Sequence, residues 1–99
     1  MPRNEWPTPA EMTVMRILQG RPRGAYGLEI VVASENAVKR GSVYVLLGRL
    51  SEKGFVRIVG TKSPAYEGPP RPQYALTLEG SRVMAAAEEI GMSFVRLRA

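Results

Sequence analysis

The sequence predicts a mainly α-helical protein with a small β-hairpin wing: a winged helix-turn-helix followed by a C-terminal dimerisation helix. Three observations support this fold class. Apolar residues recur at helical spacing in several segments of the 99-residue chain. A helical pattern at 41–53 ends in Lys-Gly and leads directly into an alternating strand pattern at 55–59. A second strand pattern at 73–76 precedes the last helix. We expect an arm at 1–7, a winged-helix DNA-binding domain at 8–77 and a dimerisation helix at 78–99.

The composition narrows the function classes. The chain has no Cys, no His and no Asp, which excludes disulfides, thiolate nucleophiles, zinc fingers and Ser-His-Asp triads. We therefore expect no enzyme activity, no cofactor and no metal. No apolar run approaches the ~20 residues of a membrane span, and the N-terminus lacks the apolar stretch of a signal peptide. The expected protein is cytoplasmic and has no membrane partner.

The positive charge is unevenly distributed. The formal net charge is +5, and between Lys39 and Arg71 seven basic residues stand against two Glu, whereas the rest of the chain is balanced. The excess therefore lies on the 41–53 helix and the hairpin after it. This placement suits binding to a polyanion such as DNA. A solvated basic surface is the alternative.

The first helix has a well-marked start. Thr8 suits the N-cap, Pro9 suits the first helical position, and Glu11 completes a capping box. Gly20 is expected to end the helix. Its apolar face comprises Val14, Met15, Ile17 and Leu18.

A second helix is expected from Gly24 to about Ala33, although Gly24 and Gly27 weaken its start. The residues available to the core are Tyr26, Leu28, Ile30, Val31 and Val32. A short strand at 37–40 would then bring two cations, Lys39 and Arg40, to the front of the next helix.

The helix at 41–53 is the candidate recognition helix. Ser42 suits its N-cap, and Gly54 suits a left-handed position after its last turn. One stripe of this helix is apolar, and the opposite face is mostly polar or small. The apolar stripe comprises Val43, Leu46, Leu47 and Leu50. The opposite face comprises Tyr44, Val45, Gly48, Arg49 and Glu52. An ordinary core helix would show the same stripe, so both interpretations stay open on this segment alone.

The hairpin is expected from strands at 55–59 and 73–76. The 60–72 connection is too long and too rich in Pro and Gly for a tight turn. In a winged helix this connection is the wing, whose Lys62 and Arg71 could reach DNA phosphates. A surface loop without DNA contacts is the alternative.

The last helix is expected to start after Thr77 and to carry a coiled-coil seam of Val83, Ala87, Ile90, Phe94 and Leu97. We expect this seam to form a dimer interface, because the three preceding helices and the hairpin already close the domain. Packing of the seam back onto its own domain is the alternative.

Together these segments resemble the PadR-type transcriptional regulators. The similarity begins with the helix start at 8–11, the Gly-Pro exit at 20–22 and the Gly-Ala-Tyr-Gly-Leu-Glu-Ile run at 24–30. It is most specific at 41–56, where Gly-Ser-Val-Tyr is followed by Arg-Leu and by Glu-Lys-Gly-Phe-Val, and at 74–80, which reads Tyr-Ala-Leu-Thr-Leu-Glu-Gly. The Pro-rich approach at 69–73 is less basic than is usual in that family.

The resemblance implies a homodimeric repressor at a pseudo-palindromic operator in double-stranded DNA, often relieved by a small aromatic effector. It places Ser42, Tyr44 and Arg49 at the groove, with Lys39 and Arg40 on the adjacent backbone. The exposed methyl groups of Val45 could also meet a thymine methyl.

The effector site is poorly marked, and its candidate residues are Trp6, Met92 and Phe94. The rival function is a winged-helix module for protein–protein contact without DNA affinity, which the Pro-rich wing and apolar last helix would also suit.

Overall fold

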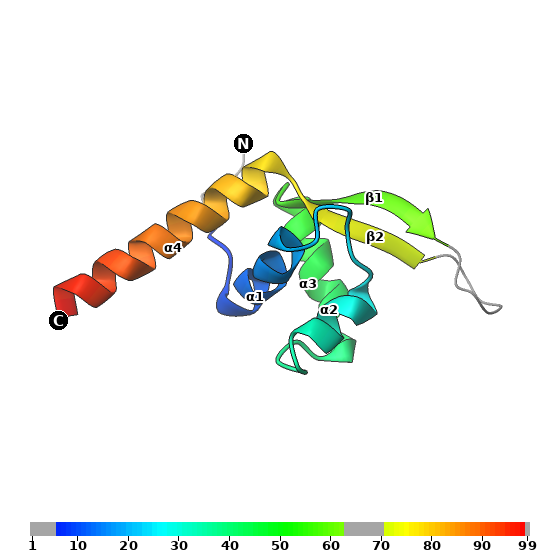
Figure 1. Cartoon of the computed structure of the whole chain (residues 1–99), viewed down its shortest axis with the longest axis horizontal. Coiled ribbons are helices and arrows are strands. Elements are labelled where there is room, and N and C mark those ends of the chain that lie inside the picture. Colours follow the sequence, from blue (N-terminus) through cyan, green and yellow to red (C-terminus); the bar gives the residue numbers. More distant parts are fainter. Residues whose placement is uncertain (1–5, 63–70, 99) are drawn as a thin grey trace.

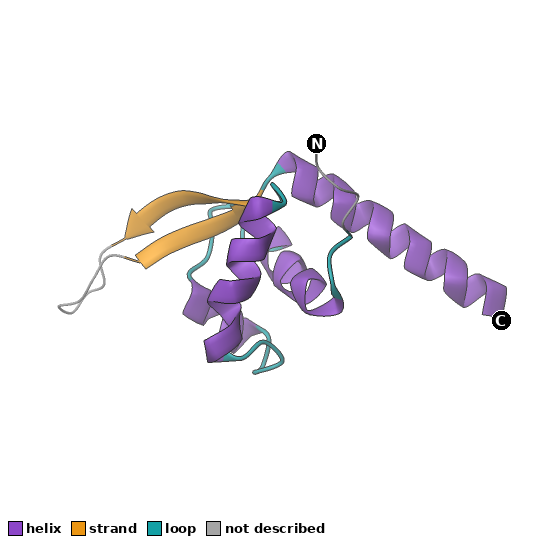
Figure 2. Cartoon of the chain, turned by 180° about the vertical axis from the view of Figure 1, so that it is seen from behind, coloured by secondary structure: helices purple, strands orange, loops and turns teal. Residues whose placement is uncertain are grey.

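The described residues fold into three short helices, a two-stranded hairpin and one long helix toward the C-terminus. The computed structural model describes residues 6–62 and 71–98, with side chains described at 6–61 and 71–91. The elements are α1 (Pro9–Gln19), α2 (Gly27–Ala33), α3 (Arg40–Glu52), β1 (Val56–Lys62), β2 (Arg71–Leu76) and α4 (Leu78–Arg98). Helices α1, α2 and α3 cluster beside the base of the hairpin, and α4 extends away from them in the direction opposite to the hairpin (Figures 1 and 2). The mainly helical fold with one hairpin is confirmed.

An apolar core lies between the three short helices, the hairpin and the first turns of α4. All four residues of the predicted α3 stripe belong to it. Val32 does not, because it is 75% exposed, so its predicted core position is wrong. The buried cluster comprises Met12, Val14, Met15, Leu18, Ala25, Ile30, Val31, Val38, Val43, Leu46, Leu47, Leu50, Phe55, Val56 and Met84.

Helix α1 has the predicted capping box. The Thr8 hydroxyl accepts a hydrogen bond from the Glu11 N–H at 3.2 Å, and the Glu11 carboxylate accepts one from the Thr8 N–H at 2.9 Å. Pro9 occupies the first helical position, where its missing N–H has no consequence for helix hydrogen bonding. Gly20 is the C-cap, as predicted.

Helix α2 begins at Gly27 rather than at Gly24, so the predicted start is wrong. Gly24 has a φ of +100°, a left-handed value that cannot belong to an α-helix. Ala25 is extended and exchanges two backbone hydrogen bonds with Tyr74 of β2, at 2.9 and 2.8 Å. This single-residue bridge takes the backbone groups that an earlier helix start would have used.

Helix α3 also begins differently from the prediction. Lys39 is its N-cap, without a side-chain capping bond, and Ser42 lies inside the first turn. The predicted N-cap role of Ser42 and the predicted strand at 37–40 are therefore both wrong. Buried Val38 instead fixes the connection, and Lys39 and Arg40 lead straight into the helix. At the other end, Gly54 has a φ of +82°, as predicted.

The hairpin pairs antiparallel, from Val56 opposite Leu76 to Lys62 opposite Arg71. Both strands run further toward the tip than predicted. The register shifts between Ile58 and Gly60, which marks a β-bulge and increases the local twist. The connection at 63–70, where the predicted wing tip falls, lies outside the described residues.

Helix α4 is fixed to the end of α3 through Thr77. The Thr77 hydroxyl accepts from the Gly80 N–H at 2.9 Å and donates to the Gly54 carbonyl at 2.6 Å. The Thr77 N–H donates to the Phe55 carbonyl at 3.0 Å. Thr77 therefore caps α4, as predicted, and joins it to the chain that leaves the candidate recognition helix.

A buried ion pair connects α1 with the end of α3. The Lys53 Nζ lies 2.7 Å from Glu11 Oε1, and the Glu11 side chain is fully buried while that of Lys53 is 17% exposed. Glu11 thus serves two structures, the cap of α1 and the attachment of α3 to α1. Sequence periodicity indicated only the first.

Candidate nucleic-acid interface

Helix α3 turns one face to the core and one face to solvent. Val43, Leu47 and Leu50 are completely buried, and Leu46 is nearly so. Val45 is 53% exposed and Tyr44 is 48% exposed. The helix is therefore held from one side and offers the other side to a partner, which is the arrangement that a recognition helix needs.

The exposed face of α3 carries few bulky side chains. Gly41 and Gly48 each leave open space where a Cβ would stand, and Val45 lies between them along the helix. Glycine inside a helix costs about 1 kcal/mol relative to alanine. Since nothing in the described packing requires these two glycines, the bare face is a feature of the surface and not of the core.

Tyr44 leans sideways from this face. Its ring and hydroxyl lie so close to Gly27 that a Cβ there would come within 2.7–2.8 Å of them. Gly27 thus leaves the space that the Tyr44 ring occupies, and the ring contacts the start of α2. Tyr44 was predicted to lie at the groove. Its side chain is half-exposed beside Gly27, so part of the ring is open to a ligand.

Tyr44 also influences Tyr74 of β2. Burial, and secondarily the charge on Tyr44, raise the pKa of the Tyr74 phenol above its ordinary 10.0. The folded protein therefore holds the phenol proton more tightly than the unfolded chain does. The contribution of the protonated phenol to the free energy of unfolding is complete below pH 10, and it is lost as the pH rises through the pKa of the folded state.

We therefore expect the wild type and the Tyr74→Phe variant to differ in free energy of unfolding by a constant amount up to about pH 9. Above pH 10 the wild type should lose stability relative to the variant, because only the wild type carries this ionisation. Denaturant unfolding at a series of pH values measures the difference. A difference that stays the same from pH 8 to pH 11 would contradict the assignment.

The predicted basic residues do not all belong to one surface. Lys39, Arg40 and Arg49 are exposed at α3, and within the described part of the chain none of them pairs with a carboxylate. Lys53 belongs to the basic 39–71 segment but was not a predicted DNA contact, and its ammonium lies in the buried pair with Glu11. Arg71 lies partly buried on β2, and the side chain of Lys62 is not among the described side chains.

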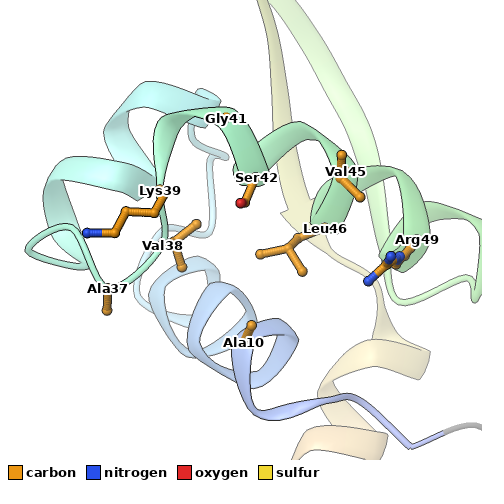
Figure 3. A pocket seen from close by; sticks show the side chains of 9 residues that line it. All are labelled: Ala10, Ala37, Val38, Lys39, Gly41, Ser42, Val45, Leu46 and Arg49. Atoms are coloured by element: carbon orange, nitrogen blue, oxygen red, sulfur yellow. The ribbon is translucent and has the colours of Figure 1, made fainter.

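A surface pocket of about 310 Å³ lies between α1 and α3. Its walls come from the first turn of α1, the connection before α3 and the first turns of α3 (Figure 3). Four of the predicted DNA-contact residues border it, namely Lys39, Ser42, Val45 and Arg49. Ala10 of α1 faces them, and sequence analysis did not single it out. An exposed alanine carries no signal by itself, and only the packing of α1 beside α3 reveals its position.

The predicted dimer seam is only partly described. Val83 and Ala87 are partly buried against the core of their own domain, whereas Ile90 is 45% exposed. The side chains of Phe94 and Leu97 lie outside the described residues, as does that of Met92. Trp6, the other candidate for an effector site, is 51% exposed.

The described residues contain neither a membrane-spanning helix nor a cluster of metal-binding side chains. None of the helices there is both long enough and apolar enough to cross a membrane. Within the same ranges, no group of three or more carboxylate side chains is placed to hold a metal ion.

Three helices with a half-exposed third helix, a hairpin and a long C-terminal helix define a winged helix-turn-helix of the transcription-regulator class. The model of the transcriptional regulator PadR-like family matches residues 14–86. This chain belongs to the PadR-like family. Comparison with curated proteins gives no match.

Solved structures agree with this assignment. A PadR family transcription regulator from hypervirulent Clostridium difficile has a TM-score of 0.73 at 21% identity, over 89% of this chain and 92% of that chain. A PadR-like transcription factor from Bacteroides fragilis has a TM-score of 0.74 at 26% identity, over 88% of this chain and 84% of that one. A mutant of S. aureus MepR bound to an oligodeoxyribonucleotide has the same fold, with a TM-score of 0.66 at 18% identity, over 91% of this chain and 62% of that one.

Proposed function

We propose that this chain is a sequence-specific DNA-binding repressor that acts in the cytoplasm as a homodimer on a pseudo-palindromic operator. The observation that carries the proposal is the exposed face of α3. It presents cations that no described carboxylate neutralises, on a helix fixed from behind by a fully buried stripe. Membership of a transcriptional-regulator family supports the same function and gives no support to an enzyme activity.

In the proposed dimer, α4 supplies the contact between subunits. Val83 and Ala87 pack partly on the core of their own domain, so the exposed Ile90 is the described seam residue most open to a partner subunit. Two recognition helices would then lie about 34 Å apart, so that each enters a successive turn of the major groove on one face of the duplex. A small aromatic effector would relieve repression by changing this spacing.

The charged residues of the proposed interface contact the DNA backbone, and its uncharged residues contact the bases. Lys39, Arg40 and Arg49 neutralise phosphates and supply most of the affinity. Ser42, Val45 and the free edge of Tyr44 face the bases and supply sequence choice. Lys62 and Arg71 of the wing would add phosphate contacts beside the hairpin.

The deciding experiment is binding to random-sequence duplex DNA over a salt series, on protein whose mass in solution has been measured. A dimer whose affinity falls steeply with salt is the expected result, because each neutralised phosphate releases counterions. No affinity at low salt would overturn the proposal and leave the exposed face of α3 as a surface for protein contact.

The Arg49→Ala variant should weaken binding to all duplex sequences alike. It should also reduce the slope of log K against log [salt] by about 0.9, the value for one lost phosphate contact. Arg82→Ala on α4 is the matched control, since it removes the same exposed charge from a helix that is not part of the proposed DNA interface. An unchanged slope for Arg49→Ala would remove Arg49 from the phosphate-contact set.

A further inference from the structure

The pocket between α1 and α3 combines an apolar floor with a polar rim. Ala10, Val38 and Leu46 supply the floor, and the last two are at most 7% exposed. At the rim, the Ser42 hydroxyl is directed inward and the Arg49 guanidinium lies at one edge (Figure 3). The aliphatic stem of Lys39 borders the opposite edge. The pocket therefore has an apolar surface on one side and positively charged hydrogen-bond donors on the other.

The charge of the pocket has one sign. No carboxylate is found among the described residues that line it. Lys39 and Arg49 are not neutralised by any described ion pair. An occupant must therefore be anionic where it meets Arg49 and Ser42, and apolar where it meets the floor. The phosphate diester of a nucleic-acid strand, with its attached deoxyribose carbons, has both properties.

The pocket also lies where a DNA strand would pass. Ser42, Val45 and Arg49 belong both to its lining and to the exposed face of α3. A helix that enters the major groove is bordered by the two strand backbones, so a backbone beside α3 would run over the space between α3 and α1.

We propose that this pocket seats one sugar–phosphate unit of the strand that borders α3, which makes Ala10 of α1 part of the DNA interface. The inference rests on the proposed function, and it adds a helix that the function did not include. Arg49 and the Ser42 hydroxyl bind the phosphate oxygens, and the deoxyribose packs on Ala10 and Leu46. Within this proposal Ser42 contacts the strand backbone instead of the bases, and Val45 and Tyr44 remain the residues that face the bases.

The test is the Ala10→Glu variant. Ala10 is exposed in the first turn of α1, where an acidic side chain is favoured by the helix dipole, so the fold should be retained. The new carboxylate would stand opposite Arg49 and repel a phosphate. We expect duplex affinity to fall at least tenfold at physiological salt. Ala10→Lys should instead raise the affinity and steepen the salt slope by about 0.9.

The matched control is Ala85→Glu, which makes the same change at an exposed alanine of α4. At physiological salt the Debye length is about 8 Å, and α4 is not part of the proposed DNA interface, so we expect a charge there to act only weakly on DNA at α3. We expect its affinity to change less than threefold. If Ala10→Glu binds duplex as well as Ala85→Glu does, the pocket is not part of the interface, while salt-dependent binding by the wild type still supports the proposed function. A wild type that binds no duplex overturns both.

A free phosphate ester would satisfy the same chemistry, and a titration distinguishes it from DNA. Inorganic phosphate and 2-deoxyribose 5-phosphate are titrated separately into the wild type and Ala10→Glu by calorimetry. Binding weaker than millimolar for both, with tight duplex binding lost in Ala10→Glu, supports the strand contact. Submillimolar binding of either small ester, lost in Ala10→Glu, would overturn it in favour of a small-molecule site.

Discussion

The Lys53→Met variant is expected to lose about 3–5 kcal/mol of unfolding free energy, the cost of leaving a buried charge without its partner. Glu11 is completely buried, and its Oε1 lies 2.7 Å from the Lys53 Nζ. Its Oε2 has no hydrogen-bond partner among the described atoms. Methionine keeps an unbranched apolar stem of four heavy atoms, with sulfur in place of one methylene, and removes the ammonium. Urea unfolding with a fitted m-value measures the loss.

Two further variants isolate the ion pair. Arg57→Met removes an exposed cation from β1, and should change stability by no more than about 0.5 kcal/mol. The double variant Glu11→Gln with Lys53→Met should recover much of the loss, because a neutral amide oxygen can still accept the Thr8 N–H. A loss below about 1 kcal/mol for Lys53→Met alone would show that the pair contributes little.

The Gly80→Ala variant is expected to be the other large loss, about 3 kcal/mol, at the top of the usual range for overpacking. A Cβ on Gly80 would overlap the backbone carbonyl group of Phe55. That carbonyl is already bound to the Thr77 N–H, so it cannot move without breaking the attachment of α4. For a domain of this size, the loss corresponds to a fall in Tm of roughly 12–24 °C.

Gly91→Ala is the control on the same helix. A Cβ there meets nothing within 4 Å, and alanine is the better helix former by about 1 kcal/mol. This variant should be as stable as the wild type or slightly more so. Equal melting temperatures for Gly80→Ala and Gly91→Ala would show that α4 and the end of α3 can separate without cost.

Local chemistry made much of the fold predictable. The capping box of α1, the apolar stripe of α3 and the left-handed Gly54 each depend on residues within a few positions of one another, and all three are confirmed. Gly24 and Ala25 were misassigned because their conformation depends on Tyr74, far along the chain. No helical periodicity can reveal a backbone partner of that kind.

In the candidate site, too, features that depend on neighbouring residues in the sequence were predictable, and features that depend on distant residues were not. Exposure of Val45 and Arg49 followed from helical spacing alone. The contact of Tyr44 with Gly27, the loss of Lys53 from the basic surface and the position of Ala10 all required α1, α2 and α3 to be placed in space. The sequence therefore predicted which face of α3 is free, but not which neighbours border that face.

The bridge between Ala25 and Tyr74 sets an order of events during synthesis of the chain. A ribosome that has reached Lys53 has made all three short helices, yet the backbone of Ala25 still lacks its partner and α3 lacks the attachment through Thr77. At about 5–20 residues per second, the segment from there to Gly80 takes roughly one to five seconds. Until then the orientation of α3 is incomplete, so a nascent chain should contain its candidate recognition helix for seconds before that helix is fixed in its final orientation.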